Sequence, residues 1–191
     1  MDEALGKLQA WTQYQVKEGF DTREEIIEQA GLYAEETLER ADLLRHVERL
    51  TDELMQAHRR EQAQWATPTD CDRLDQAFAE LERRGVVARQ NFTCCQTCGL
   101  AEIGDEIEEV EKEREVEGYV FYHMQDTESV LEHGGFCLAY GAVDGSQDGT
   151  AEVGHRAVEE LVRAGLKVEW DGSVATRICV TDFDWKRRRA L

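Results

Sequence analysis

The first 66 residues carry their apolar side chains at helical spacing. Between residues 5 and 16 these side chains recur every three to four positions, until Gly19 breaks the pattern. Residues 22–25 have the form of a capping box, which predicts the start of a second helix. A third apolar stripe runs over residues 43–55. We therefore predict that residues 1–66 form a helical segment whose faces pack on one another, on a second domain or on a second chain.

Beyond this segment helical and strand patterns alternate. Pro68 is the only proline and marks the predicted boundary, and Thr69 is the expected N-cap of a helix that ends at Gly85. The alternation predicts an α/β or α+β fold for residues 69–191, with a mixed sheet of about five strands and packed helices. The expected strands are 86–92, 118–124, 135–143, 166–170 and 175–183, and the expected helices are 94–116, 127–133 and 150–164.

The charge of the chain limits its partners. The net charge is −19, from 41 acidic and 22 basic residues, and such a field repels nucleic-acid phosphates and anionic membranes. No apolar run approaches the ~20 residues of a membrane span, and the N-terminus lacks the pattern of a signal peptide. We expect a cytoplasmic protein whose six cysteines are mostly reduced. The basic run 186–189 is expected to be a solvated tail or a salt-bridge partner.

Three of the six cysteines lie within five residues, at the junction between a predicted strand and a predicted helix. Thr93 is the expected N-cap of that helix, with Gln96 at the capping-box position. Cys94 and Cys95 then occupy the first turn, where free N–H groups and the helix dipole lower the pKa of a thiol. Cys98 completes a CxxC spacing with Cys95. This cluster is the main candidate for a functional site, because a purely structural protein does not require three thiols so close together.

Further polar residues follow the predicted strands. If strands 86–92, 118–124 and 135–143 are parallel, their carboxyl ends meet at one edge of the sheet, where ligands of open α/β sheets bind. The connection over residues 125–134 is short for a parallel crossover, so the third strand is also compatible with the opposite direction. In the parallel case the edge gathers Gln90, Asn91, Thr93, Cys94, Cys95, His123, Gln125, Asp126, Tyr140 and Asp144.

Zinc binding is one use of the cluster. Cys95 and Cys98 have the spacing of two zinc ligands, and His123 is the candidate third ligand. A structural zinc site needs four ligands, and the chain has no second CxxC pair. Completion therefore depends on distant residues such as Cys137 or His133. Zinc is the cofactor that the sequence suggests.

Thiol chemistry is the second use. The order strand–CxxC–helix resembles the arrangement in thioredoxins, but no proline follows the motif, so the cis-proline loop of that family is absent. A different redox switch stays open. In a third use, Cys94 or Cys95 is a nucleophile, with His123 and Asp126 as its base and orienting group, so the catalytic candidates are Cys94, Cys95, His123 and Asp126.

A structural role is the plainest interpretation of the cysteines. Buried cysteines behave as small apolar side chains. Cys71, Cys137 and Cys179 fit this role on helix and strand faces, and Cys94 or Cys98 can share it. His123, within an apolar strand, is then a hydrogen-bonded core histidine.

Three strings of the chain resemble a known family. They are ARQNFTCCQTCG, GYVFYHMQDTE and GGFCLAYGA, and together they lie between residues 88 and 142. The pattern resembles an uncharacterised bacterial family classed as a domain of unknown function, over about residues 70–185 and a more variable helical part before them. The resemblance implies a bacterial, cytoplasmic protein. It implies no activity and therefore assigns no catalytic residue.

Two hypotheses for the function follow. The first is a small cytoplasmic interaction protein with structural cysteines, which contacts a protein partner or forms a homodimer. The alternative is a metal-binding or thiol-redox site built on Cys94, Cys95 and Cys98. The sequence leaves open whether the protein is an enzyme, and it favours neither nucleic acid nor membrane as a partner.

Overall fold

The computed structural model describes residues 2–33 and 40–189, which divide into two compact units. The first unit runs to Thr67 and also includes the chain from Lys186 onward; the second is Pro68–Trp185. The division after Thr67 lies next to the predicted boundary. The basic tail, which the sequence analysis grouped with residues 69–191, belongs to the helical unit.

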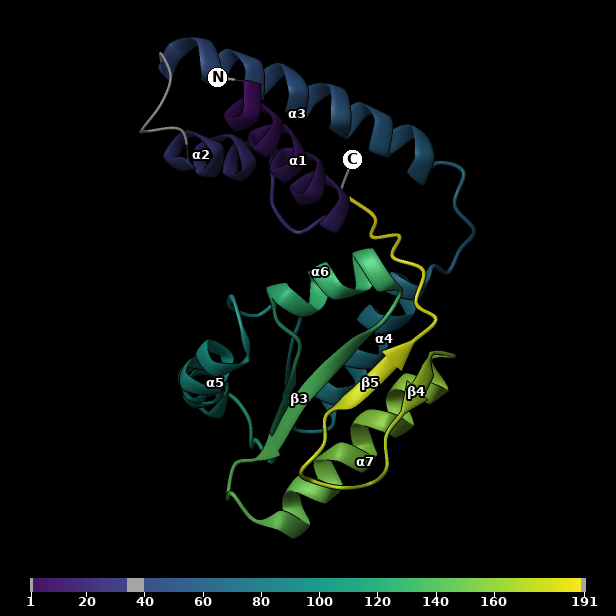
Figure 1. Ribbon diagram of the computed structural model, residues 1–191. Helices are drawn as coiled ribbons and strands as arrows, with labels where there is room; N and C mark the ends of the chain where they lie inside the picture. Colours follow the sequence, from purple (N-terminus) through teal and green to yellow (C-terminus); the bar gives the residue numbers. More distant parts are fainter. Residues whose placement is uncertain (1, 34–39, 190–191) are drawn as a thin grey trace. The chain divides into compact units, whose positions relative to one another are not determined.

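The helical unit contains α1 (Asp2–Glu18), α2 (Arg23–Tyr33) and α3 (Arg40–Gln62) (Figure 1). The capping box at the start of α2 forms as predicted. The Thr22 hydroxyl accepts a hydrogen bond from the Glu25 N–H at 3.3 Å, and the Glu25 carboxylate accepts one from the Thr22 N–H at 2.7 Å. Two free N–H groups of the helix end are thereby satisfied.

The apolar faces of the three helices pack on one another. The buried residues form two clusters, one around Leu8, Ala30 and Val47 and the other around Val16, Ile26 and Met55. Each cluster takes a side chain from each helix. The helices thus bury their apolar stripes within their own unit, which is the first of the arrangements expected from the sequence.

The basic tail packs on these helices. Arg189 donates hydrogen bonds to the backbone carbonyls of Gln15 and Val16, at the carboxyl end of α1, and of Asp21. Gln62 bonds both the N–H and the carbonyl of Arg189, at 2.8 and 3.1 Å. A guanidinium at the carboxyl end of a helix satisfies free carbonyls and complements the dipole. The expectation of a solvated tail is wrong for this residue.

The second unit is an α+β fold. Its elements are α4 (Asp70–Arg83), β1 (Val86–Arg89), α5 (Gln96–Glu111), β2 (Gly118–Phe121), α6 (Met124–His133), β3 (Phe136–Ala142), α7 (Gln147–Arg163), β4 (Lys167–Glu169) and β5 (Ile178–Thr181). Thr69 is the N-cap of α4, as predicted, in a capping box with Asp72. None of the helices that the structure describes is long and apolar enough to cross a membrane.

The five strands form one mixed sheet in the order β1-β2-β3-β5-β4. Strands β1 and β2 are parallel, with α5 between them in the chain, and the other neighbouring pairs are antiparallel. Strand β3 therefore runs opposite to β1 and β2. The parallel alternative is wrong, because the ladder between β2 and β3 is antiparallel and α6 joins them at the same edge of the sheet. Asp144 consequently lies beyond the other end of β2 from His123, while Tyr140 is within β3 and pairs with Val120.

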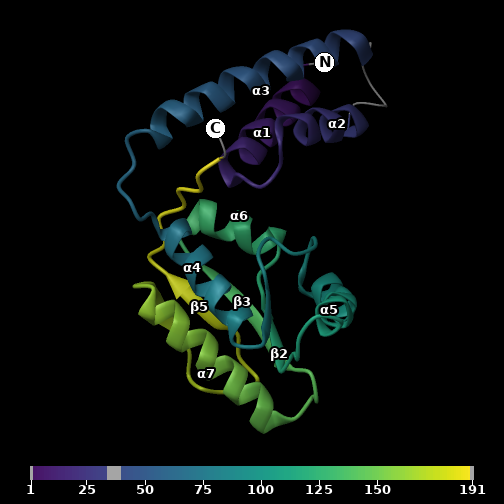
Figure 2. The ribbon, with the colours of Figure 1, turned by 180° about the vertical axis from the view of Figure 1, so that it is seen from behind.

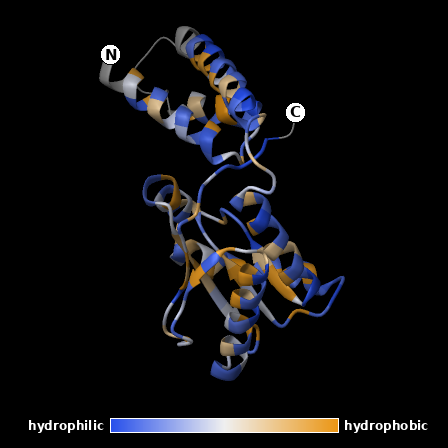
Figure 3. Cartoon of the chain, turned by 90° about the vertical axis from the view of Figure 1, so that its right-hand side faces the viewer, coloured by the Kyte–Doolittle hydropathy of each residue, from blue (hydrophilic) through white to orange (hydrophobic). Residues whose placement is uncertain are grey.

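The side chains of β2 alternate between the two faces of the sheet. Gly118 contacts Val153 of α7, and Tyr122, just beyond the strand, contacts Phe78 of α4. Phe121 points to the other face, toward α5. Figures 1 and 2 show α4 and α7 on one side of the sheet, and Figure 3 shows apolar residues gathered on the strands and on helix faces. Strand β2 therefore contributes side chains to the core on both faces of the sheet.

Two cysteines of the sheet are joined. Cys137 on β3 and Cys179 on β5 are direct partners in the antiparallel register, with their Cα atoms 4.0 Å apart, and they form a disulfide. The expectation that both are reduced, small apolar side chains is wrong, because the register places their sulfur atoms side by side. Cys71, by contrast, is not in a disulfide and is buried in α4, as expected.

Candidate functional site

The cysteine cluster is exposed at the start of α5. One sulfur atom from each of Cys94, Cys95 and Cys98 lies within 4.8 Å of the other two. The Cys94 thiol donates a hydrogen bond to the Cys98 sulfur at 3.3 Å. Cys94 is exposed and the other two are partly exposed, so none of them is a buried packing residue. Among the side chains that the structure describes, these three form the one group of potential metal ligands that are mutually this close.

Helix α5 begins two residues later than predicted. Its N-cap is Cys95, with extended backbone at φ −156° and ψ 170°. Thr93 cannot be the N-cap, because its φ is 58°, and its hydroxyl bonds the Cys95 carbonyl at 3.2 Å instead. The first turn therefore contains Cys98, whereas Cys94 lies in the loop before it. The prediction of Thr93 as N-cap is wrong.

Backbone hydrogen bonds hold this loop beside the end of β2. Phe92 donates its N–H to the Tyr122 carbonyl at 2.8 Å, and the Thr93 carbonyl accepts the Met124 N–H at 3.1 Å. Thr93 is β-branched, and a left-handed φ is costly for such a residue unless the surroundings impose it. The bonds on either side supply that constraint. The cysteine loop thus has a defined conformation fixed by the strand next to it.

Gly99 fixes the start of α5 against the sheet. A Cβ atom at this position would lie 2.4 Å from the buried Phe121 ring, a distance that real contacts do not reach. The helix can approach the ring this closely because glycine has no side chain. The Gly immediately after the CxxC spacing therefore sets where the first turn, and with it Cys98, lies.

The thiols of the cluster differ in acidity. The Cys98 and Thr97 N–H groups and the neighbouring thiols face the Cys95 sulfur, and they lower the pKa of Cys95, with the Cys98 N–H as the largest cause. The Cys95 sulfur accepts no regular N-cap hydrogen bond from these N–H groups. The lowering of its pKa therefore comes from the nearby N–H dipoles, which favour the thiolate. The pKa of Cys98 is raised to about 12, first by side-chain hydrogen bonds with Cys94 and Cys95 and then by repulsion between like charges on these thiols. Cys95 is the thiol that ionises more readily.

His123 caps the neighbouring helix α6. Its Nδ1 accepts the Asp126 N–H at 3.3 Å, and its Nε2 lies 3.0 Å from the Asp126 carboxylate. Arg177 donates to both oxygens of the same carboxylate, at 3.0 and 2.6 Å. Burial lowers the pKa of His123, and Arg177 adds to this while Asp126 opposes it. The imidazole is held neutral between these groups.

This arrangement bears on the roles proposed for His123 and Asp126. Both ring nitrogens face Asp126, and His123 is not a member of the cysteine cluster. The ring therefore has no nitrogen directed to Cys94 or Cys95 as a base or as a shared metal ligand. The catalytic set of two thiols, His123 and Asp126 stays a prediction, and in this geometry the last two act together as a buried cap.

Gln90 and Asn91, which follow β1, bond residues outside the cysteine cluster. Gln90 bonds Asp75 and accepts from Tyr122, while Asn91 accepts from Thr127 at 2.7 Å. Cys137 and His133, the distant residues on which a complete zinc site was expected to depend, are not part of the cysteine cluster. The sulfur of Cys137 is in the disulfide, and His133 is exposed beside Glu132.

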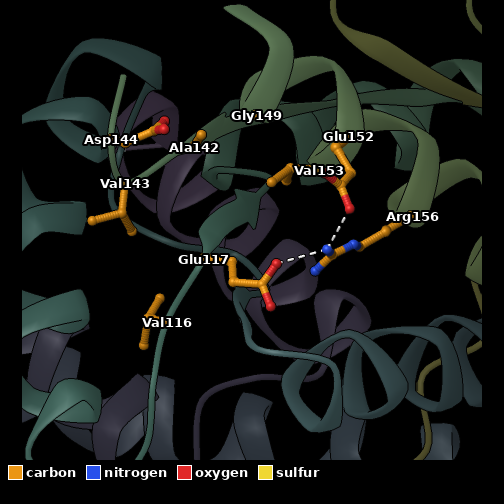
Figure 4. A pocket seen from close by; sticks show the side chains of 9 residues that line it. All are labelled: Val116, Glu117, Ala142, Val143, Asp144, Gly149, Glu152, Val153 and Arg156. Carbon is orange, nitrogen blue, oxygen red and sulfur yellow. Dashed lines mark hydrogen bonds and ion pairs between the residues drawn. The ribbon is translucent and has the colours of Figure 1, made fainter. Parts of the chain in front are cut away.

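A pocket of about 360 Å³ lies at the opposite end of β2, and Asp144 lines it (Figure 4). Arg156 reaches across it to Glu117 and Glu152, both at 2.6 Å. Its guanidinium also donates to the Arg84 carbonyl. Arg156 thus pairs with two of the three carboxylates of this pocket, the third, Asp144, accepts the Ser146 N–H, and the remaining lining is mainly small and apolar. The pocket offers no set of side chains directed at a ligand.

Sequence reasoning missed two features. Arg177 joins the chain before β5 to the buried carboxylate of α6, 51 positions away, and no local pattern marks such a partner. The disulfide depends on the register of β3 and β5. A signal for the His123 cap was present, since a polar residue followed three positions later by an acid at a helix start has the form of a capping box.

Comparisons with known proteins place the chain in a family without an assigned activity. Neither the curated proteins nor the solved structures contain a match to it. A family model does match, over residues 1–189, and thus includes both the helical unit and the cysteine loop. The chain belongs to the family described as a domain of unknown function, DUF6891.

Proposed function

We propose that this protein binds a thiophilic metal ion, zinc in the first instance, through the thiolates of Cys94, Cys95 and Cys98. The observation that carries the proposal is the mutual distance of the three sulfur atoms, all within 4.8 Å. A Zn–S bond of about 2.3 Å with tetrahedral angles places two ligand sulfurs about 3.8 Å apart. The observed contact of 3.3 Å between Cys94 and Cys98 has to widen only slightly.

Three protein ligands leave one coordination position open. In zinc proteins three ligands and a water molecule are typical of catalytic sites, whereas structural sites are closed by a fourth residue. His123, which the sequence suggests as a zinc ligand beside Cys95 and Cys98, is paired with Asp126 instead. Cys94 is exposed, so the open position faces outward and is accessible to a small molecule, a protein partner or a second copy of the chain. The hypothesis of a protein partner or homodimer is therefore compatible with the metal proposal, because either can occupy the open coordination position.

Metal binding by these thiols has a predictable pH dependence. The ligand form of cysteine is the thiolate, so each thiol that holds a proton must lose it on binding. Cys98, with its pKa of about 12, holds its proton most firmly. Affinity should therefore rise with pH, and binding should release protons.

The test is the metal content of the untagged full-length protein, purified without chelator and measured by elemental mass spectrometry. We expect about one zinc per chain, lost in Cys95→Ser and kept in Cys71→Ala. Cys71 is the matched control because it is a thiol outside both the disulfide and the cluster. One zinc per two chains, together with a dimer in solution, would identify a second copy as the source of the remaining ligands. Metal-free protein that also fails to bind added zinc would contradict the proposal.

Dithiol–disulfide exchange is the second candidate, favoured by the contact between the Cys94 and Cys98 sulfurs. In this reaction a small-molecule disulfide is reduced to two thiols while two cluster thiols lose their protons and form a disulfide. Mass spectrometry after incubation with oxidised glutathione separates the candidates. A cluster disulfide, formed equally fast with and without zinc, would favour exchange over metal binding.

The cellular location of the protein is also part of this proposal. A bacterial, cytoplasmic location remains our expectation, supported by the resemblance of the motifs and by the charge of the chain. The disulfide between Cys137 and Cys179 differs from what a reducing compartment favours, and its redox state in the purified protein is therefore informative.

A further inference from the structure

The cysteine cluster offers three ligands where a closed zinc site needs four. Among the residues that the structure describes, no histidine, carboxylate or fourth cysteine belongs to the group formed by Cys94, Cys95 and Cys98. The imidazole of the neighbouring His123 is paired with Asp126. The cluster by itself would therefore satisfy an ion that requires three ligands and no more.

The spacing of the thiols also fits such an ion. Two sulfurs on one tetrahedral zinc ion lie about 3.8 Å apart, whereas the Cys94 and Cys98 sulfurs are 3.3 Å apart. An ion with three ligands and a lone pair is pyramidal, and the lone pair pushes the three bonds toward one another. Its ligand sulfurs lie closer together than those of a tetrahedral ion with bonds of similar length. Trivalent arsenic has this geometry, and it prefers thiolate ligands as other soft ions do.

The charge around the cluster favours a neutral ligand over an anion. Cys94 is exposed, so the thiols are accessible from solvent. Glu102 and Asp105, four and seven positions after Cys98, lie on the same face of α5 and are exposed. Together with the net charge of −19, these carboxylates repel arsenate and phosphate. Arsenous acid is uncharged at neutral pH, and this field does not oppose its approach.

The backbone holds the thiols in place before any ligand arrives. The Gly99 N–H donates to the Cys95 carbonyl at 2.9 Å, and the Thr93 hydroxyl donates to the same carbonyl at 3.2 Å. The Met124 N–H in turn donates to the Thr93 carbonyl at 3.1 Å. Once two thiols have bound an ion, the third is already close by, and its bond forms within one molecule at a high effective concentration.

We propose that the cluster binds trivalent arsenic from arsenous acid, through one arsenic–sulfur bond to each of Cys94, Cys95 and Cys98. The proposal rests on the proposed function in using the same three thiols, but it does not require that zinc binds them. Each thiol gives up its proton, and each arsenic–oxygen bond is replaced by an arsenic–sulfur bond. The three hydroxyl groups leave with the three protons as water. Arsenic stays trivalent and no sulfur is oxidised, so the reaction needs no oxidant or reductant.

The test is a titration of the full-length protein with arsenite, followed by non-denaturing mass spectrometry, with the thiols kept reduced by a phosphine. We expect one arsenic per chain and the loss of three hydrogen atoms, one for each bond formed. Cys95→Ser should weaken binding at least about a hundredfold, because the third bond is lost. Cys71→Ala, outside the cluster, is the control and should bind as the wild type does. Arsenate, added after removal of the phosphine, should not bind.

X-ray absorption at the arsenic edge is a second measurement, and it needs no variant. Three sulfur neighbours and no oxygen neighbour are expected. An oxygen neighbour, or a mass that retains a hydroxyl group, would show that only two thiols bind and would overturn the proposal. Binding that is unchanged in Cys95→Ser would also overturn it, because the thiols of a reduced Cys137–Cys179 pair would then account for the arsenic.

The two proposals for the cluster can fail separately. Protein that binds zinc but not arsenite would overturn the arsenic proposal and leave the metal proposal in place. Protein that binds arsenite through three sulfurs but never binds zinc would do the reverse. If both ligands bind, arsenite should displace bound zinc, because they use the same thiols.

Discussion

Glu18 is a buried carboxyl group whose ionisation opposes folding. It is the last residue of α1, and only 4% of its surface is exposed. Burial, followed by the charge of Asp21, raises its pKa from 4.5 to about 7, while Tyr14 and Arg189 act in the opposite direction. The native state therefore keeps a proton on Glu18 in a pH range in which the unfolded chain has lost it.

The size and sign of the effect follow from linkage. The difference of 7 − 4.5 = 2.5 pKa units corresponds to about 3 kcal/mol, at 1.36 kcal/mol per unit. Between pH 4.5 and 7 the native state binds more protons than the unfolded state, so this contribution to stability falls as the pH rises. Below pH 4.5 both states are protonated and the cost disappears.

The substitution Glu18→Gln should remove this cost, because the amide has nearly the same shape and carries no charge. We expect the variant to exceed the wild type in stability by up to about 3 kcal/mol at pH 8 and to equal it near pH 4.5. The readout is the opening free energy of the α1 amides from hydrogen exchange, which reports on the helical unit alone. Glu28→Gln, an exposed position on α2, is the control and should change little at either pH.

The difference between Glu18→Gln and the wild type has to grow with pH between 4.5 and 7. A difference that is constant across this range, or a variant less stable than the wild type at pH 8, would refute the reasoning. In the first case the carboxyl titrates normally, and in the second its charge is stabilised by Arg189 more than burial opposes it.

Three further predictions concern the second unit. Gly99→Ala should destabilise it by about 1–3 kcal/mol in urea unfolding and weaken zinc binding, whereas Gly104→Ala, in the same helix with open space around it, should be neutral or slightly stabilising. Thiol titration of the denatured, unreduced protein should find four free thiols, and finding six would show that Cys137 and Cys179 are not joined. The stability of the second unit should fall as the pH drops below 6.5, because the buried His123 resists the proton that the same residue accepts in the unfolded chain. The variant His123→Asn, which can still cap α6, should lose this part of the pH dependence. An unchanged pH profile in the variant would contradict the prediction.

The helices and their ends were determined largely by the local sequence. The capping box at Thr22 and the N-cap at Thr69 form where the pattern placed them, because the groups that satisfy one another there are three residues apart. The apolar stripes likewise predicted which faces of α1, α2 and α3 are buried. The existence of the cysteine cluster is also a local property, since its three members lie within five positions.

The chemistry of the cluster depended on contacts that are distant in sequence. The strand beside the loop holds Thr93 in a left-handed conformation, and this moves the N-cap from Thr93 to Cys95. The direction of β3 separates Asp144 from the cysteine edge, and the register of β3 with β5 pairs Cys137 with its partner.

Each of these features follows from the pairing of segments 18 or more positions apart. Such pairing is decided by how the layers pack as a whole, and a local pattern of apolar and polar residues carries no record of it. The sequence by itself determined the elements and the candidate thiols, and the tertiary structure decided which side chains those thiols face.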